Sequence, residues 1–446
     1  MNIFFISLGC DKNLVDSENM LGILHDNGYT ITDYENDADI IIINTCCFIH
    51  DAKEESIETI LEMAKHKETG RLKALIVTGC LAERYKDEIL NEIPEVDALL
   101  GTSAISEIIS VIEKVLNGNK YTCFTDINNQ PVLKSKRILS TGSYSYLKIA
   151  EGCDKHCTYC IIPKVRGNFR SRPMEELVEE AAYLAENGVK ELILVAQETT
   201  LYGRDLYGRK ALPGLLDKLC EIPGIEWIRI LYCYPEEITD ELIDTISRQP
   251  KICKYLDMPI QHCSDRILKL MGRKTSKKDI VNIVKKLRDK IPGIALRTTL
   301  ITGFPTETDE EHEELLRFIE EERFERLGVF TYSKEEGTPA SKLKPQVTAK
   351  VKRQRQKELM KLQQTIAFDI SASQVGRILD VIIEGRIAGK DNVYVGRTYM
   401  DGPKVDGYIF MESDSELMSG DIIKVKVTGA NYYDLIGEIV EGSARE

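Results

Sequence analysis

The sequence predicts an α/β protein with three parts: an open parallel sheet at the N-terminus, a central partial (β/α)6 barrel and a small C-terminal β-barrel. Short apolar runs alternate with helical patterns in the first part of the chain, and strand and helix patterns alternate again in the middle. Alternating runs separated by Gly and Asp occupy the end. A chain of 446 residues, of which 43% are hydrophobic and 29% charged, is long enough for several such cores.

The first part, residues 1–118, predicts a βαβ array. Three short apolar runs have the composition of strands buried on both faces of a parallel sheet, namely residues 2–8, 39–45 and 73–78. The clearest helical pattern begins at Asp51, where Asp51 and Glu54 are placed to cap the helix. Its expected apolar face consists of Ile57, Ile60, Leu61 and Ala64.

A polar stretch over residues 119–138 is typical of a linker. The second array, residues 139–370, contains six runs with strand composition, at 146–150, 191–196, 227–231, 255–258, 295–301 and 327–331. Helical patterns separate them, such as residues 173–187, which Gly188 closes. Strands that alternate with helices predict a β/α barrel, and six units predict a partial one.

The end of the chain predicts a charged helix followed by a small domain. Residues 350–370 are rich in Lys, Arg and Gln and favour a connecting helix with one apolar side. Within residues 371–442, alternating runs lie at 378–384, 392–397 and 422–427. These runs predict a small β-barrel.

The composition argues against several classes of protein. A formal net charge of -13 disfavours a broad nucleic-acid footprint, which needs clustered Lys and Arg. No membrane association is expected, because the N-terminus lacks a signal-peptide pattern and no apolar run reaches about 18 residues. We therefore expect a cytoplasmic protein, in which clusters among the 12 cysteines indicate metal binding or catalysis rather than disulfides.

The most informative motif is the C-x3-C-x2-C run of Cys153, Cys157 and Cys160, which follows the expected strand 146–150. Three thiolates can bind three irons of a 4Fe-4S cluster and leave the fourth iron open to another ligand. The alternative is zinc, but closed zinc sites usually have four protein ligands, more commonly from two C-x2-C pairs. The run therefore predicts an iron-sulfur cluster at the carboxyl end of a barrel strand, where such barrels place active sites.

A second set of cysteines is dispersed along the N-terminal part. Cys10, Cys46 and Cys80 each follow an apolar run, in the contexts Ser-Leu-Gly-Cys, Ile-Asn-Thr-Cys and Val-Thr-Gly-Cys. Ligand sites of open parallel sheets lie at the carboxyl ends of the strands, so the three thiols should emerge at one edge. They predict a second 4Fe-4S cluster, against the alternative that each is a small core residue.

The remaining cysteines lack metal-binding spacing, and we expect core or incidental roles for Cys47, Cys123, Cys220, Cys233, Cys253 and Cys263. Residues 166–172 contain three arginines. This segment predicts either a site for an acidic group or a solvated loop.

The cysteine run and the partial barrel, over residues 140–370, resemble the radical S-adenosylmethionine superfamily. The resemblance implies that the open iron binds S-adenosylmethionine, which an electron splits into methionine and a 5′-deoxyadenosyl radical. It also implies that Tyr159 lies near the adenine, the alternative being a core tyrosine. Gln197, Arg297 and Gly303 are candidate cofactor contacts, but a turn glycine and a salt-bridged arginine are equally compatible with the sequence.

Nearly the whole chain is similar to the methylthiotransferases, in Gly9-Cys10, Asn13, Asp16-Ser17-Glu18, Asn44-Thr45-Cys46 and Gly79-Cys80. The similarity implies a flavodoxin-like N-terminal domain whose cluster handles sulfur, a radical core and a C-terminal TRAM domain that recognises the substrate. Two equivalents of S-adenosylmethionine would be used to replace a hydrogen with a methylthio group. An electron donor such as flavodoxin or ferredoxin would serve as a partner.

Within that family, three features favour the branch that modifies the β-carbon of an aspartate in small-subunit ribosomal protein S-twelve. Lys12-Asn13 and residues 259–262 (Pro-Ile-Gln-His) resemble that branch. Residues 372–446 contain 8 Lys and Arg against 13 Asp and Glu, a poor surface for tRNA and a suitable one for a basic protein. The alternative is a tRNA adenosine 2-methylthiotransferase, and the second alternative is a non-catalytic iron-sulfur binding or redox-sensing module.

Overall fold

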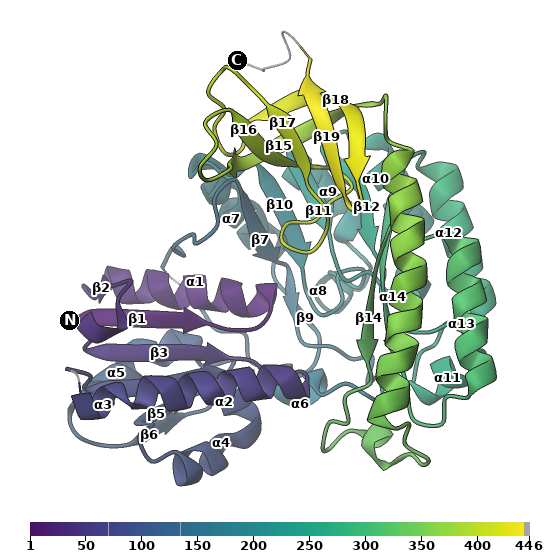
Figure 1. Ribbon diagram of the computed structural model, residues 1–446. Helices are drawn as coiled ribbons and strands as arrows, with labels where there is room; N and C mark the ends of the chain where they lie inside the picture. The colour runs from purple at the N-terminus through teal and green to yellow at the C-terminus, as the bar shows by residue number, and fades with distance from the viewer. Residues whose placement is uncertain (70, 134, 441–446) are drawn as a thin grey trace. The chain divides into compact units, whose positions relative to one another are not determined.

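The computed structural model describes residues 1–69, 71–133 and 135–440 (Figure 1). These residues divide into two compact units. Unit 1 comprises Met1–Ser140, Ala150–Arg170 and Ser333–Ser341, and unit 2 comprises Thr141–Ile149, Ser171–Tyr332 and the chain from Lys342 onward. Residue 134 of the expected linker and residues 441–442 of the expected C-terminal domain lie outside the described residues.

Unit 1 is built on six parallel strands in the order β2-β1-β3-β4-β5-β6. The three expected runs form β1 (Asn2–Ser7), β3 (Ile40–Thr45) and β4 (Ala74–Gly79). Three short strands extend the sheet, namely β2 (Thr30–Ile31), β5 (Ala98–Leu100) and β6 (Tyr121–Cys123). Runs of two or three residues carry no detectable periodicity, and β6 lies inside the segment that we expected to be a linker.

Helices cover both faces of this sheet. Their bounds are α1 (Asp11–Asp26), α2 (His50–Ala64), α3 (His66–Thr69), α4 (Cys80–Glu92) and α5 (Ile108–Leu116). Ile41 and Ile43 of β3 pack with α2 and α4, whereas Ile40 and Ile42 pack with α1 and α5. Because alternate residues of a strand point to opposite faces, a strand covered on both sides is apolar throughout.

The buried face of α2 differs from the expected one. Ile60 and Ala64 are buried, but Ile57 and Leu61 are 40% and 47% exposed, so the prediction was wrong for these two residues. Ser56 is buried instead, because its hydroxyl accepts a hydrogen bond from Cys46 N (3.1 Å) and donates one to Cys46 O (2.9 Å). The helix begins at His50 without a side-chain cap, so the expected cap by Asp51 and Glu54 is also absent.

The central sheet of unit 2 contains all six expected strands. They lie parallel in the order β14-β13-β12-β11-β10-β7, as a partial (β/α)6 barrel requires. The strands are β7 (Tyr144–Lys148), β10 (Glu191–Val195), β11 (Trp227–Ile230), β12 (Ile252–Asp257), β13 (Ala295–Thr302) and β14 (Arg326–Thr331). The helices between them are α7 (Met174–Glu186), α8 (Arg204–Tyr207), α9 (Leu212–Cys220), α10 (Asp240–Arg248), α11 (Asp265–Leu270), α12 (Lys277–Lys290) and α13 (Asp309–Glu322).

The long helix α14 (Ala349–Ala372) packs against β14 and α13 and leads to the C-terminal barrel (Figure 1). The predicted barrel is confirmed as five strands closed in the order β15-β16-β17-β19-β18. Its strands are β15 (Ile378–Arg386), β16 (Val393–Thr398), β17 (Ile409–Glu412), β18 (Ile422–Asn431) and β19 (Asp434–Ile439). Among the helices of the described residues, none combines the length and apolarity that crossing a bilayer requires.

A buried ion cluster joins this C-terminal barrel to the central sheet. Glu191, the first residue of β10, accepts hydrogen bonds from Arg229 Nε (2.7 Å) and Arg397 Nη2 (2.6 Å), and all three side chains are inaccessible to solvent. Although burial opposes ionisation, the two guanidinium groups hold the pKa of Glu191 below its ordinary value. Arg229 also donates to Tyr399 O at 2.7 Å. Removing one member would leave an uncompensated buried charge, so the barrel is firmly held at this end of the sheet.

Candidate functional site

The C-x3-C-x2-C run lies on a closed loop of unit 1. The run follows β8 (Ala150–Glu151) and precedes α6 (Ile162–Arg166) and β9 (Arg170–Ser171). Gly152 has a φ of +79°, and a Cβ at this position would lie 2.0 Å from Asn168 O. Only glycine therefore allows the two sides of the loop to approach each other.

The three cysteines of the run gather inside this loop. Cys153 and Cys157 are buried, and Cys160 is partly exposed. The backbone closes around them, because Cys160 N–H donates to Cys157 O (3.0 Å) and Cys153 N–H donates to Gly167 O (3.1 Å). The N–H of Ile162 lies 3.4 Å from Cys160 Sγ. Burial raises the pKa of the Cys160 thiol, and charge on Cys157 or Cys153 raises it further, so the three sulfurs influence one another.

The dispersed cysteines meet at the carboxyl edge of the N-terminal sheet. Cys10 precedes α1, Cys46 follows β3, and Cys80 is the first residue of α4. Cys10 is exposed, whereas Cys46 and Cys80 are buried. Burial raises the pKa of the Cys80 thiol; Arg166 lowers it, while Cys46 and Cys10 raise it. The topology thus brings together three thiols that are far apart in the sequence.

Two glycines permit this convergence. Gly9 has a φ of +89°, and a Cβ there would lie 2.7 Å from Cys46 Cβ and 3.0 Å from Cys46 Sγ. Gly79 has a φ of +91°, and a Cβ there would lie 2.3 Å from Asn44 Oδ1. Each glycine directly precedes one of the cysteines, so the loops carrying Cys10 and Cys80 pack more closely than any larger residue would allow.

In the part of the chain that the structure describes, no three His, Cys, Asp or Glu side chains are arranged to hold a single metal ion. A cubane cluster has a different requirement, because each of its three protein thiolates binds a separate iron. Both triads consist of thiolate donors only, which is the donor chemistry of iron-sulfur clusters. The residues present therefore fit such a cluster.

Asparagine side chains tie α1 to the loops of the dispersed triad. Asn13 Nδ2 donates to Leu8 O (3.0 Å) and Thr45 O (2.9 Å). Asn44 Nδ2 in turn donates to Asn13 O and to Ser17 Oγ, both at 2.9 Å. These bonds satisfy the backbone carbonyls of Leu8, Asn13 and Thr45 and fix the positions from which Cys10 and Cys46 project.

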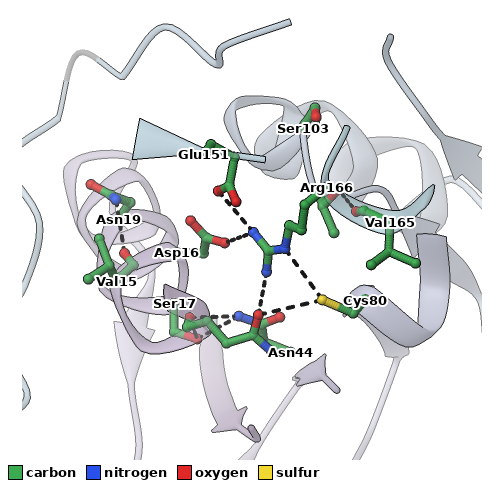
Figure 2. Close-up of polar contacts among 12 residues, drawn as sticks. Val15, Asp16, Ser17, Asn19, Asn44, Cys80, Ser103, Glu151, Val165 and Arg166 are labelled. Atoms are coloured by element: carbon green, nitrogen blue, oxygen red, sulfur yellow. Dashed lines mark hydrogen bonds and ion pairs between the residues drawn. The ribbon is translucent and has the colours of Figure 1, made fainter. Parts of the chain in front are cut away.

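Arg166, at the end of α6, lies in the middle of this polar network (Figure 2). Its guanidinium is almost fully buried and donates from Nη1 to Asp16 Oδ2 (2.6 Å) and Glu151 Oε2 (3.2 Å). The Nε–H points at Cys80 Sγ, 3.4 Å away, and Nη2 donates to Asn13 Oδ1. The sequence left two interpretations of residues 166–172, a site for an acidic group or a solvated loop. Arg166 agrees with the former, because it binds the carboxylates of Asp16 and Glu151, which belong to the protein itself.

A second buried group of charges lies at the same edge of the sheet, and its acidic member, Glu335, belongs to residues 333–341. Glu335 accepts from Lys53 Nζ of α2 and Arg84 Nη1 of α4, both at 2.9 Å. Arg84 Nη1 also donates to Cys47 O at 3.2 Å. Cys47 is fully buried and its Sγ–H donates to Cys80 O at 3.2 Å, in keeping with the core role expected for it. Segments from distant parts of the chain thus brace the cysteine loops.

The candidate contacts to the cofactor are Tyr159, Gln197, Arg297 and Gly303. Two of them lie at the carboxyl ends of the central strands. Gln197 follows β10, and Gly303 follows β13 with a φ of +71°. A Cβ at Gly303 would lie 2.3 Å from Lys352 Cγ, so the side chain of Lys352 packs directly against the backbone of Gly303. Tyr159 directly precedes Cys160 and is partly exposed.

Arg297 lies elsewhere in the central sheet. It is the third residue of β13, and its Nη1 donates to Asp257 Oδ1 at 3.0 Å. Its Nε lies 3.6 Å from Asp406 Oδ1, in the segment between β16 and β17. The salt-bridged arginine, one of the two interpretations that the sequence left open, is what the structure contains.

Sequence comparisons identify the family. Successive segments match the uncharacterized protein family UPF0004 (residues 2–101), the radical SAM superfamily (147–319) and the TRAM domain (375–440). The ribosomal protein uS12 methylthiotransferase RimO of Lachnoclostridium phytofermentans is 65% identical over 98% of this chain and 99% of its own. The chain belongs to the RimO family of radical SAM methylthiotransferases. The RimO protein of Thermoanaerobacter sp. is 50% identical over 98% of this chain and 99% of its own.

Solved structures similar to this RimO-family chain support the fold. The radical S-adenosylmethionine methyltransferase TsrM from Kitasatospora setae, with cobalamin and a 4Fe-4S cluster bound, matches 76% of this chain and 73% of its own with a TM-score of 0.57 and 12% identity. The cobalamin-dependent radical enzyme OxsB matches 82% of this chain and 57% of its own, with a TM-score of 0.51 and 13% identity. At these identities the likeness concerns architecture.

Sequence reasoning missed the residues that hold the cysteine loops of this RimO-family chain. Ser56 and Glu335 carried no motif signal, because their contacts with Cys46 and Lys53 arise from the folded loops and not from a local sequence pattern. Arg166 was part of an arginine-rich segment, but no local pattern named Asp16 and Glu151 as its partners. The predicted cysteines themselves were detectable because each follows a strand or stands at cluster spacing.

Proposed function

We propose that this RimO-family chain inserts a methylthio group at the β-carbon of an aspartate in ribosomal protein uS12. The observation that carries the proposal is the pair of thiol triads held in one unit, one on the C-x3-C-x2-C loop and one at a sheet edge. A generic radical enzyme needs one cluster, whereas insertion of sulfur calls for a second site that can hold it. The names of the RimO relatives support the choice of substrate.

The proposed ligands of the two 4Fe-4S clusters are Cys153, Cys157 and Cys160 for the first and Cys10, Cys46 and Cys80 for the second. When bound, these clusters supply an electron for the cleavage of S-adenosylmethionine and a site for the transferred sulfur. The chain's own residues position the thiolates, exclude water from the buried members of each triad and donate a hydrogen bond from Arg166 to Cys80 Sγ. The electron would come from a partner such as flavodoxin or ferredoxin.

Contacts to S-adenosylmethionine are proposed for Tyr159, Gln197 and Gly303. Gln197 and Gly303 end strands of the central sheet at the edge where β/α barrels bind their ligands, and Tyr159 adjoins a proposed cluster ligand. Arg297 is better explained as a structural residue, because Asp257 and Asp406 neutralise its charge.

The acidic C-terminal barrel supports a basic protein as substrate. Its excess of Asp and Glu would repel the phosphates of a tRNA, which is the alternative substrate within the wider methylthiotransferase family. We propose residues 1–118, 139–370 and 371–442 as the sulfur-handling, radical and substrate-recognition domains, and the cytoplasm as the place of action.

Mass spectrometry of a deletion strain tests this function. Ribosomal protein uS12 from the strain should lack a modification of roughly 46 daltons, the mass difference on replacing H with SCH3. Expression of the intact chain should restore it. If the modification is lost from bulk tRNA and uS12 is unchanged, the tRNA alternative is correct. If neither changes and reduced protein forms no 5′-deoxyadenosine with substrate, the chain is a binding module.

Replacing Gly79 with Ala should prevent assembly of the N-terminal cluster. The new methyl group would lie 2.3 Å from Asn44 Oδ1 and 2.5 Å from Thr45 O, so the loop before Cys80 must shift. After anaerobic reconstitution, we expect the iron bound per chain to fall to about half of the wild-type value. Gly28→Ala is the control, because Gly28 also has a positive φ but a Cβ there meets nothing within 4 Å. Equal iron contents in the two variants would contradict the prediction.

A further inference from the structure

We propose that Arg166 is a positioning residue for the N-terminal cluster, which donates a hydrogen bond to the sulfur of Cys80 and thereby raises the reduction potential of that cluster. The inference rests on the proposed function, because it assumes that Cys80 is a cluster ligand. It assigns a role to a residue outside both cysteine triads.

The guanidinium of Arg166 has a fixed orientation. Arg166 is only 2% exposed, and Asp16 and Glu151 both accept hydrogen bonds from its Nη1. Asn13 accepts from Nη2. A planar guanidinium held at one end by three oxygens cannot rotate freely, so its remaining Nε–H stays directed at Cys80 Sγ (Figure 2).

The effect of Arg166 on the cluster is electrostatic. Asp16 and Glu151 compensate the charge of the guanidinium as a whole, but its Nε–H lies 3.4 Å from a ligand sulfur and stabilises negative charge on that sulfur. A reduced cluster carries one more negative charge than an oxidised one, so it is stabilised more strongly. Hydrogen bonds to the sulfurs are one of the means by which proteins set cluster potentials. The burial of Arg166 strengthens the effect, because solvent does not screen it.

The Arg166 donor comes from the loop that carries the other cysteine triad. Arg166 ends α6, which begins two residues after Cys160. Thr102 Oγ1 donates to Val165 O at 2.9 Å and fastens α6 to the loop after β5. The loop that carries one triad therefore supplies the donor to a ligand of the other.

A redox titration of full-length protein tests the proposal. In a reference variant that carries Cys153→Ala, Cys157→Ala and Cys160→Ala, only the N-terminal cluster remains, and electron paramagnetic resonance follows its reduction. Adding Arg166→Gln should reduce the equilibrium constant for reduction roughly tenfold, or about 59 mV for a one-electron couple. Adding Arg166→Lys, which keeps the charge and loses the Nε–H, should shift the potential in the same direction by less.

Arg137→Gln is the matched control. Arg137 is also buried in unit 1 and pairs with Glu18 of α1 at 2.8 Å, so its loss reports the general effect of breaking a buried ion pair on that helix. We expect the potential in this control to equal that of the reference.

The outcomes distinguish a failure of the proposed function from a failure of the role proposed for Arg166. If the reference variant binds no cluster, the proposed function fails at this site. If it binds a cluster and Arg166→Gln leaves the potential unchanged, the role of Arg166 is refuted. Should Arg166→Gln fail to fold, an unchanged potential in Arg166→Lys refutes that role equally, whereas a lowered one supports it.

Discussion

Replacing Cys153 with Ala should abolish the cleavage of S-adenosylmethionine. Cys153 is a buried member of the C-x3-C-x2-C run, and two thiolates cannot replace three in holding a cluster with one open iron. Loss of an outer-shell partner of a metal typically costs 10- to 100-fold, so loss of a ligand should cost more than roughly a hundredfold. Chromatographic measurement of 5′-deoxyadenosine after anaerobic reduction provides the readout.

Cys253→Ala is the control for this experiment. Cys253 is similarly buried, but it lies in β12 and belongs to neither triad, so its loss creates only a small cavity. Cleavage by the Cys253 variant should remain near the wild-type rate. Normal 5′-deoxyadenosine formation by Cys153→Ala would contradict the assignment of the first cluster.

Replacing Cys10 with Ala should separate the two activities. The variant should still cleave S-adenosylmethionine, because the loop with Cys153, Cys157 and Cys160 is intact. It should lose transfer of the methylthio group to uS12 by more than roughly a hundredfold, since the second triad is incomplete. Cys10 is exposed and precedes α1, so its removal leaves the core of the sheet unchanged. The two readouts are 5′-deoxyadenosine and the mass of uS12, measured on the same reaction.

Cys123→Ala provides the comparison here, because Cys123 is a partly exposed cysteine of unit 1 in the edge strand β6. It should retain both activities. Methylthio transfer by Cys10→Ala at the wild-type rate would show that sulfur insertion does not depend on this triad.

Much of the fold could be predicted because burial leaves a local record in the sequence. The run Ile40–Thr45 is buried throughout, and each of its residues is apolar or hydrogen-bonded at the strand end. The six central strands were detectable for the same reason. The strands β17 and β19 were not, because β17 has four residues and β19 contains Gly and Glu between its apolar positions.

The cysteines could be predicted, but not the residues that hold them. A position directly after a strand is a local property, and it was enough to bring Cys10, Cys46 and Cys80 to one edge. The pairing of Arg166 with Asp16 and that of Glu335 with Arg84 depend on how loops fold back over more than a hundred residues. A contact of shorter range changed the buried face of α2, where the hydrogen bonds of Ser56 with Cys46 override the apolar periodicity that pointed to Ile57.

The junction between the C-terminal barrel and the central sheet lies at a fixed distance along β13 from the carboxyl edge of that sheet. Asp406 pairs with Arg297 near the start of β13, and Gly303 follows the end of the same strand. The six residue steps from Arg297 to Gly303 correspond to roughly 20 Å at about 3.3 Å per residue. The strand β13 is therefore a spacer between the barrel junction and the carboxyl edge of the central sheet. In the proposed function, a substrate bound by the barrel extends its reacting side chain over that distance, which a protruding loop of a folded protein can do and a short peptide held at the barrel cannot.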